Sequence, residues 1–192
     1  MNINEILSKM NFVNGIELNE MPELDLYMDQ VIQLFENKLG ELKRNDEEKI
    51  LTKTMINNYA KGKLLLPIKN KKYSKEHLIL MSLIYNLKGA LSISDIKTVL
   101  EPIISSYNSE EEYPIRELYE CYLEESAEEI EMFKNQVSSK IDAIEEKVEK
   151  GKNFNGEFEK QFLLICSLVN MSNMYRRMSE KIIDEIFSKE EK

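Results

Sequence analysis

The chain has 192 residues, of which 42% are hydrophobic and 32% charged, and its formal net charge is −9. A chain of this length can bury a core of its own, and its apolar residues recur at helical spacing, which excludes wholesale disorder. Residues 162–169 form the most apolar segment and are too few to span a bilayer. The N-terminus carries Glu5 early and has no basic stretch before an apolar run, so we expect a cytoplasmic protein.

Charge is distributed unevenly along the chain. Residues 1–37 carry one basic and seven acidic side chains, and residues 101–192 carry twelve basic and twenty-two acidic ones. Between them, residues 49–75 contain eight lysines and no acidic residue, and we call this stretch the lysine-rich segment. In a chain with 35 acidic residues, such a gap is typical of a surface that contacts a polyanion. A merely solvated lysine face is the alternative.

The first elements are an N-terminal extension and one amphipathic helix. Residues 1–22 predict a short, frayed helix followed by a loop. Apolar residues at helical spacing predict a helix over 23–39, and Gly40 is a suitable stop. Residues 41–51 are mostly charged and are expected to form a connector with at most one helical turn.

A short helix and an extended segment follow. Thr52 or Thr54 can cap a helix that reaches about Lys61 and ends at Gly62. Residues 63–73 contain a proline and an asparagine that disfavour a helix, together with three consecutive leucines that need cover. This segment is therefore predicted to be an extended or hairpin-like excursion.

Two further helices complete the middle of the chain. Ser74 begins a helix, with a capping box shifted by one residue, and Gly89 closes it. Ser92 or Ser94 caps the next helix, whose inward positions include Ile96 and Leu100. Both helices have the apolar spacing of elements that pack on a common core.

The C-terminal half is predicted to be a helical hairpin. Residues 105–112 are polar and acidic, and we interpret them as a hinge and domain boundary. Pro114 suits the first turn of a helix that reaches about Lys150, with an apolar seam whose period is close to 3.6 residues, as in a globular bundle. A turn over 151–156 leads to a final helix over 157–188.

These elements predict an all-α protein in two parts. Residues 1–22 are an N-terminal extension, residues 23–104 a DNA-binding domain of the winged helix-turn-helix kind, and residues 113–190 a C-terminal helical domain for dimerisation or sensing. In such a domain the second helix reads base edges and the wing contacts the DNA backbone. The candidate DNA-binding residues lie on the short helix and the excursion after it: Lys53, Thr54, Asn57, Asn58, Lys61, Lys63, Lys69, Lys71 and Lys72.

The chemistry of these side chains suits a duplex. Asparagine can bond adenine through both N6 and N7, which makes Asn57 and Asn58 candidates for base contacts. Lysine and threonine can reach phosphates or guanine. The lysines after residue 62 are expected to contact phosphates.

The middle of the chain resembles the DNA-binding domain of MerR-type regulators. The resemblance covers about residues 50–103 and rests on Tyr59, the run KGKLLLP, the pair Tyr73-Ser74 and the closing run LSISDIKTVL. The stretch from Leu26 to about Ile104, with LYMDQV, LTKTMINNY and KKYSKEHL, is similar to the uncharacterised bacterial family filed as domain of unknown function 1836. Both resemblances imply a regulatory, DNA-binding role.

The sequence departs from the MerR pattern in three places. Asn70-Lys71-Lys72 stands where MerR relatives carry Gly-Tyr-Arg, Asn57 stands where they often carry arginine, and the connector after the first helix is long. Phosphate contact is still implied by the resemblance, whereas the family's way of deforming DNA is not.

Several conspicuous residues have structural interpretations. Tyr59 and Tyr73 are expected in the core, with base stacking as the alternative. His77, the only histidine, is expected to be structural or simply exposed, because a lone histidine cannot hold zinc. Cys121 and Cys166 lie among apolar helical neighbours and are expected to be packed, reduced thiols.

The sequence as a whole therefore predicts a transcription regulator that acts as a homodimer on double-stranded DNA. No catalytic motif is present, so we expect no enzyme, no metal and no cofactor. Dimerisation is expected through the last helix, whose residues 158–174 have more apolar surface than one neighbouring helix covers. The alternative is a monomer whose C-terminal hairpin folds back onto the first domain. The alternatives are a protein-interaction adaptor whose basic patch binds an acidic partner, and a helical enzyme or sensor that acts through the C-terminal hairpin. An unknown effector is compatible with each of them.

Overall fold

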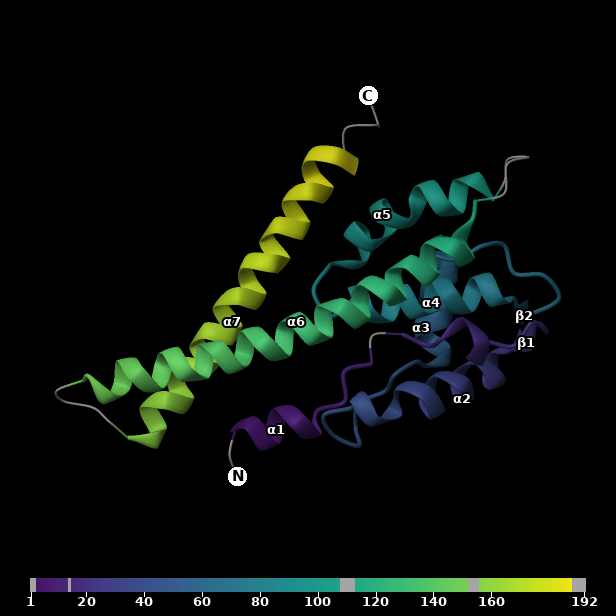
Figure 1. Ribbon diagram of the computed structural model, residues 1–192. Helices are drawn as coiled ribbons and strands as arrows, with labels where there is room; N and C mark the ends of the chain where they lie inside the picture. The colour runs from purple at the N-terminus through teal and green to yellow at the C-terminus, as the bar shows by residue number, and fades with distance from the viewer. Residues whose placement is uncertain (1–2, 14, 108–112, 152–155, 188–192) are drawn as a thin grey trace. The chain divides into compact units, whose positions relative to one another are not determined.

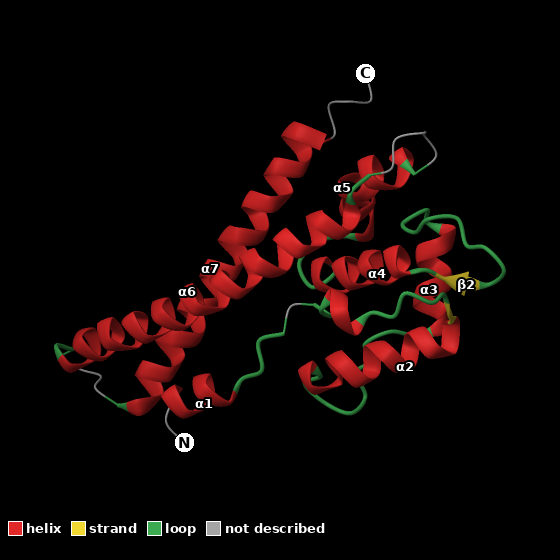
Figure 2. Cartoon of the chain, turned by 45° about the vertical axis from the view of Figure 1, so that its right-hand side comes forward, coloured by secondary structure: helices red, strands yellow, loops and turns green. Residues whose placement is uncertain are grey.

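The computed structural model describes residues 3–13, 15–107, 113–151 and 156–187. Within these ranges it is mostly helical, with a sheet of two short strands, which confirms the expected all-α class (Figures 1 and 2). The residues group into two compact units. The larger unit holds 11–125 with 183–192, and the smaller unit holds 1–10 with 126–182.

The larger unit contains the elements of the lysine-rich segment. It contains a 3₁₀ turn (Leu18–Glu20), and a second such turn, Gly40–Leu42, follows helix α2 (Met28–Leu39). Helix α2 is shorter than the predicted 23–39, because the residues before Met28 are extended and pair with a second strand. The main elements of the larger unit, in chain order, are β1 (Leu26–Tyr27), α2 (Met28–Leu39), α3 (Lys53–Lys61), β2 (Lys72–Tyr73), α4 (Lys75–Leu87), α5 (Ile93–Ser106) and the start of α6 (Ile115–Glu149).

Helix α4 is the centre of the larger unit's core. Four consecutive residues, Leu78 to Met81, are completely buried, and so is Ile84. A helix that is apolar on all sides must be covered on all sides. The cover comes from Phe35 of α2, Ile56 of α3, and the α5 and α6 residues that join the same cluster. The first half of this helix is thus buried on all sides.

The predicted excursion between α3 and α4 is extended and partly buried. Leu64, Leu65 and Leu66 are all buried, so the segment passes through the core. Lys69 then bridges to Lys72, and β2 pairs with β1 in an antiparallel register that sets Leu26 against Tyr73. The extended or hairpin-like prediction is confirmed, and β1, the strand before α2, completes its pairing.

The chain before α2 is fastened to α6 through a buried tyrosine. The Tyr119 hydroxyl donates to the Ile16 carbonyl at 2.9 Å and accepts from the Ile16 N–H at 3.1 Å. Ser82 of α4 lies 2.8 Å from the same hydroxyl. Burial raises the pKa of Tyr119 to about 12, so the phenol stays protonated. Gly15 permits this approach, because a Cβ there would lie 2.6 Å from the tyrosine oxygen.

The smaller unit consists of α1 (Ile3–Lys9), most of α6 and α7 (Glu157–Ile182). Its core is small and includes Val137, Ile141 and Val148 of α6 and Leu164 of α7. The predicted seam along α6 is therefore buried at these positions. The last predicted helix ends as a π-helical turn, Ile183–Phe187.

The remaining expectations for the C-terminal half of the chain concern the hinge, the turn between its two long helices and the cysteines. Most of the predicted hinge, 108–112, and most of the turn at 151–156 lie outside the described residues. Cys121 and Cys166 are exposed, so the expectation of packed thiols is wrong: each occupies an outward position of its helix. No helix in the part of the chain that the structure describes combines the length and apolar character needed to cross a membrane.

Candidate functional site

Helix α3 presents five of the candidate residues on a single outward face. Thr52 caps the helix by accepting a hydrogen bond from the Met55 N–H at 3.1 Å, as predicted. Ile56 and Tyr59 are buried, which confirms Tyr59 as a core residue and fixes the rotation of the helix. Lys53 and the positions one, four, five and eight residues after it then lie on the side of the helix opposite Ile56 and Tyr59. That outward face consists of exposed side chains: Lys53, Thr54, Asn57, Asn58 and Lys61.

Two of the candidate lysines already have partners in the larger unit. The ammonium group of Lys53 lies 2.8 Å from a carboxylate oxygen of Asp29, and both side chains are exposed. The ammonium group of Lys72 lies over the ring of Tyr27, 5.1 Å from its centroid. An exposed ion pair is worth little and is readily exchanged. Neither contact therefore prevents these lysines from meeting an anion.

The end of α3 places a lysine in the left-handed region. Gly62 is the predicted end of the helix, but its φ is −73°, and the left-handed residue is Lys63, with φ 59°. The Leu64 N–H bonds the Tyr59 carbonyl at 2.9 Å, and the Lys63 N–H bonds the Ala60 carbonyl at 3.2 Å. These two bonds form a Schellman motif, in which glycine is usual at the position of Lys63.

The turn before β2 places a second lysine in the same strained region. Asn70 and Lys71 have φ of 52° and 58°, and the Lys72 N–H bonds the Lys69 carbonyl at 2.9 Å. Positive φ at both central residues defines a type I′ turn, which strongly favours asparagine followed by glycine. Asparagine is present at the first position, whereas lysine occupies the second.

Strain in the described backbone is thus concentrated in the lysine-rich segment. Lys63, Asn70 and Lys71 are the non-glycine residues with positive φ in the described ranges, and no glycine there has positive φ. A left-handed residue other than glycine costs roughly 1–2 kcal/mol. Both lysines are exposed, so packing of their side chains does not compensate for this cost. Their charge is the property that glycine would lack.

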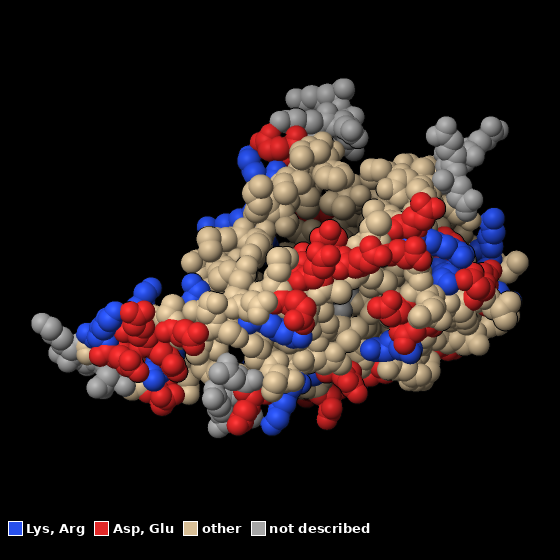
Figure 3. All heavy atoms as spheres, viewed as in Figure 1, with Lys and Arg blue, Asp and Glu red and all other residues tan. Residues whose placement is uncertain are grey.

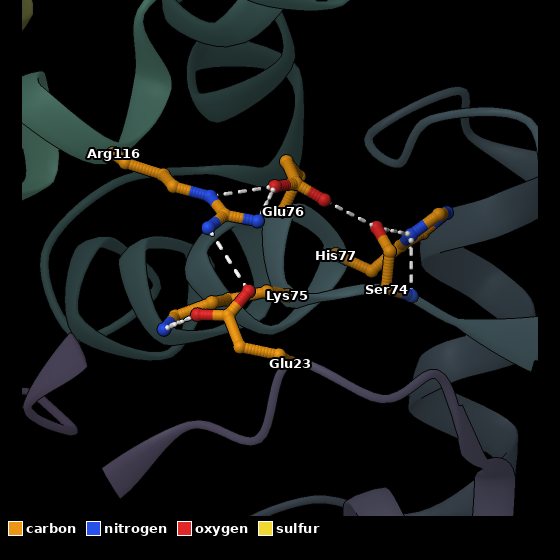
Figure 4. A network of polar contacts seen from close by, with 6 residues as sticks. All are labelled: Glu23, Ser74, Lys75, Glu76, His77 and Arg116. Carbon is orange, nitrogen blue, oxygen red and sulfur yellow. Dashed lines mark hydrogen bonds and ion pairs between the residues drawn. The ribbon is translucent and has the colours of Figure 1, made fainter. Parts of the chain in front are cut away.

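One lysine of the segment has a structural role. Lys75, in the first turn of α4, is buried and donates to a carboxylate oxygen of Glu23 at 2.5 Å (Figure 4). The guanidinium group of Arg116, at the start of α6, bonds the second oxygen of Glu23 at 3.0 Å. It also bonds one oxygen of Glu76 through Nε and Nη2, at 2.9 and 2.6 Å. This network joins the chain before β1 to the first turns of α4 and α6.

The two carboxylates of the network are held in the ionised form. The hydrogen bond from Lys75, followed by the one from Arg116, lowers the pKa of Glu23. Burial alone would raise the pKa of Glu76, but hydrogen bonds from Ser74 and Arg116 outweigh it and lower the pKa. Sequence spacing carries no sign of this network, since its members lie up to 93 positions apart.

His77 connects the buried leucine segment to the start of α4. Its Nδ1 accepts from the Ser74 N–H at 3.1 Å, and its Nε2 lies 3.2 Å from the Leu66 carbonyl, to which it donates. His77 is therefore the third residue of an ordinary capping box, and the predicted one-residue shift is wrong. Burial lowers the pKa of His77, which keeps the ring neutral and able to accept at Nδ1. Of the two expectations for His77, a structural role is confirmed and simple exposure is wrong.

Helix α6 has the opposite charge to the lysine-rich segment. It carries eleven acidic and four basic residues, and acidic side chains form a band along it in Figure 3. A polyanion would be repelled by this helix and attracted by the outward face of α3 and the loop after it. The charge pattern therefore distinguishes one surface of the larger unit from α6.

All nine sequence-predicted site residues lie on α3, on the loop 62–71 or at the start of β2. Eight of them are exposed, and Lys72 is half-buried against Tyr27. The protein is thus all-α, with an exposed polar helix face followed by a basic loop that contains the strained residues.

The chain belongs to the family described as "Domain of unknown function (DUF1836)", whose model matches residues 16–122. No curated protein and no solved structure matches this chain.

Proposed function

We propose that this protein is a DNA-binding transcription regulator of the MerR-like, winged helix-turn-helix kind. In this proposal α2 and α3 are the helix pair, the outward face of α3 reads base edges, and the loop 62–71 with β2 is the wing. One observation carries the proposal: in a stretch of 27 residues with eight lysines and no acid, six of the lysines lie on an exposed helix face, in the loop after it or at the start of β2.

The chemistry of that surface is suited to a duplex. Asn57 and Asn58 are exposed on a helix that itself contains no acidic residue. Their amides can bond adenine, while Lys61 at the end of α3 can reach a phosphate. The strained lysines of the loop add positive charge where the wing of such a domain contacts the DNA backbone.

The test is duplex binding as a function of salt. Lys71→Glu combined with Lys72→Glu should weaken binding to duplexes of any sequence, because phosphate contacts position a protein without specifying bases. The slope of log affinity against log salt should become shallower by about 0.9 for each phosphate that the variant no longer neutralises. The measurement is a fluorescence anisotropy titration at several salt concentrations.

A matched control separates a local effect from a change in net charge. Lys147→Glu with Lys150→Glu changes the net charge by the same amount on exposed positions near the end of α6. It should leave the affinity close to that of the unmodified protein. Equal losses in both double variants, or no duplex binding by the unmodified protein at low salt, would reject the proposal and favour the adaptor hypothesis.

A further inference from the structure

The larger unit contains a cavity of about 550 Å³ beside the C-terminal end of α4. Its lining comes from three segments: residues 11–13, residues 42–50 after α2, and residues 85–89 at the end of α4. Small-molecule sites in proteins usually have volumes of roughly 300–1,000 Å³ and combine an apolar lining with a few polar groups. The size of this cavity therefore suits a small organic molecule.

Part of the lining is apolar and aromatic. Phe12, Val13 and Leu42 are half-buried there, and Ile50 is buried. Tyr85 adds a half-buried aromatic ring. Apolar side chains that remain partly exposed in a concave surface favour a ligand whose own apolar surface covers them. The lining thus favours an occupant with an aromatic or aliphatic body.

Lys88, the residue after α4, supplies a half-buried positive charge to the same lining. Its ammonium group donates to the Ile50 carbonyl at 3.3 Å and lies 4.6 Å from the centroid of the Tyr85 ring. None of the ion pairs in the described part of the chain includes Lys88. Burial lowers the pKa of Lys88, and the charge of Glu48 opposes this shift. An ammonium group has three N–H donors, so an anion in the cavity could accept from Lys88 and stabilise its charge.

The other charges around the cavity indicate the charge of the ligand. Lys43 is already paired with Glu36, outside the lining. The remaining charged residues of the lining are Lys49, Lys88 and Glu48, which together leave one net positive charge. A carboxylate, with a single negative charge, matches this balance. A phosphate monoester carries nearly two negative charges, and Glu48 would oppose the second one.

We propose that this cavity binds a small carboxylate with an aromatic or apolar body. The carboxylate accepts a hydrogen bond from the Lys88 ammonium group, and the body covers the apolar part of the lining. Another cavity of the larger unit, lined in part by Arg116, differs in that its cation already bonds two carboxylates. The inference does not rest on DNA binding.

Calorimetric titration of the full-length protein tests the ligand class. The probes are cinnamate, an aromatic carboxylate, and cinnamamide, its neutral analogue of the same shape. Cinnamate should bind at one site per chain, and cinnamamide should bind roughly tenfold more weakly or less, because only the anion makes a charged hydrogen bond to Lys88. Phenyl phosphate should also bind more weakly than cinnamate. Equal affinity for cinnamate and cinnamamide, tighter binding of phenyl phosphate, or no binding of cinnamate at millimolar concentration would overturn the proposal.

Substitution of Lys88 tests the site itself. Lys88→Gln should weaken cinnamate binding roughly tenfold or more and leave the weak binding of cinnamamide unchanged. Lys88→Arg keeps the charge and should keep most of the affinity, which separates the loss of charge from damage to the fold. Lys97→Gln removes the same charge from an exposed position of α5 and is the matched control, so its affinity should equal that of the unmodified protein. If Lys88→Gln, with unchanged circular dichroism, binds cinnamate as tightly as the unmodified protein, the proposal fails. The comparison of cinnamate with cinnamamide requires no variant and decides the proposal even if Lys88→Gln does not fold.

Discussion

Lys63 and Lys71 are unfavourable for folding at the positions that they occupy. Each occupies a backbone conformation in which glycine is the usual residue, one in a Schellman motif and one in a type I′ turn. Non-glycine residues in such conformations often mark functional sites, because the strain persists only where something outweighs it. Here the side chains are exposed lysines, so an anion outside the fold is the partner that we infer.

The first prediction is that Lys71→Gly makes the protein more stable and a weaker DNA binder. Removing the left-handed strain, less the added freedom of glycine in the unfolded chain, should raise the free energy of unfolding by about 0.5–1 kcal/mol. The loss of charge should lower duplex affinity. Urea denaturation and anisotropy titrations measure the two effects separately.

Lys71→Arg is the matching control, since it keeps both the charge and the strain. It should preserve affinity and leave stability unchanged. If Lys71→Gly stabilises the fold without weakening duplex binding, the lysine has no role in anion binding, whatever the remaining residues do.

Helix α3 shows how a short element is oriented by its core residues. Ile56 and Tyr59 are buried, and the Thr52 cap fixes where the helix begins. Because helical positions have a fixed angular spacing, these three residues also determine that Asn57 and Asn58 point outward. The outward face is predictable from sequence for this reason.

A second prediction concerns those two asparagines. Asn57→Ala or Asn58→Ala should change the preference among duplex sequences more than it changes non-specific binding, because a bidentate base contact discriminates by roughly 1–3 kcal/mol. Selection of bound sequences from a random duplex library measures the preference. Asn37→Ala, an exposed asparagine on α2, is the control and should keep the original preference. If both α3 variants select the same sequences as the unmodified protein, α3 is not the reading helix.

The polar network around the start of α4 connects the stability of the whole molecule to pH. His77 is the only histidine, and its Nδ1 must be unprotonated to accept the Ser74 N–H. Burial lowers its pKa from the ordinary 6.5, while the Leu66 hydrogen bond and the charges of Glu76 and Asp25 oppose this shift. Above pH 6.5 the neutral ring contributes its full stabilisation, which diminishes as the pH falls from 6.5 through the lower pKa of the folded state.

We therefore expect the free energy of unfolding to fall between pH 7 and pH 5, by at most about 1.4 kcal/mol per pH unit for this one group. Denaturation curves at several pH values measure the slope. His77→Gln should be less stable at neutral pH and should lose the slope in this range. The carboxylates Glu23 and Glu76, whose pKa values are lowered, act only at more acidic pH, below about 4.5. A slope that persists in His77→Gln would contradict this origin.

Local sequence patterns were sufficient to predict the helices, most of their caps and the outward face of α3. These features depend on residues within one or two turns of each other, so periodicity and capping chemistry encode them directly. The resemblance to the family of unknown function, now confirmed over residues 16–122, also rests on such local runs. The MerR-like role remains a proposal.

Which distant residues meet depends on the tertiary structure alone. The pairing of β1 with β2, the Glu23–Arg116 contact and the Tyr119 hydroxyl on Ile16 each join segments far apart in the chain. No local pattern encodes them, because their geometry depends on how α4 is covered from all sides. The left-handed lysines belong to the same group. Their positive φ values arise because the chain must reverse direction between packed elements. Local backbone preference alone would favour glycine at both positions.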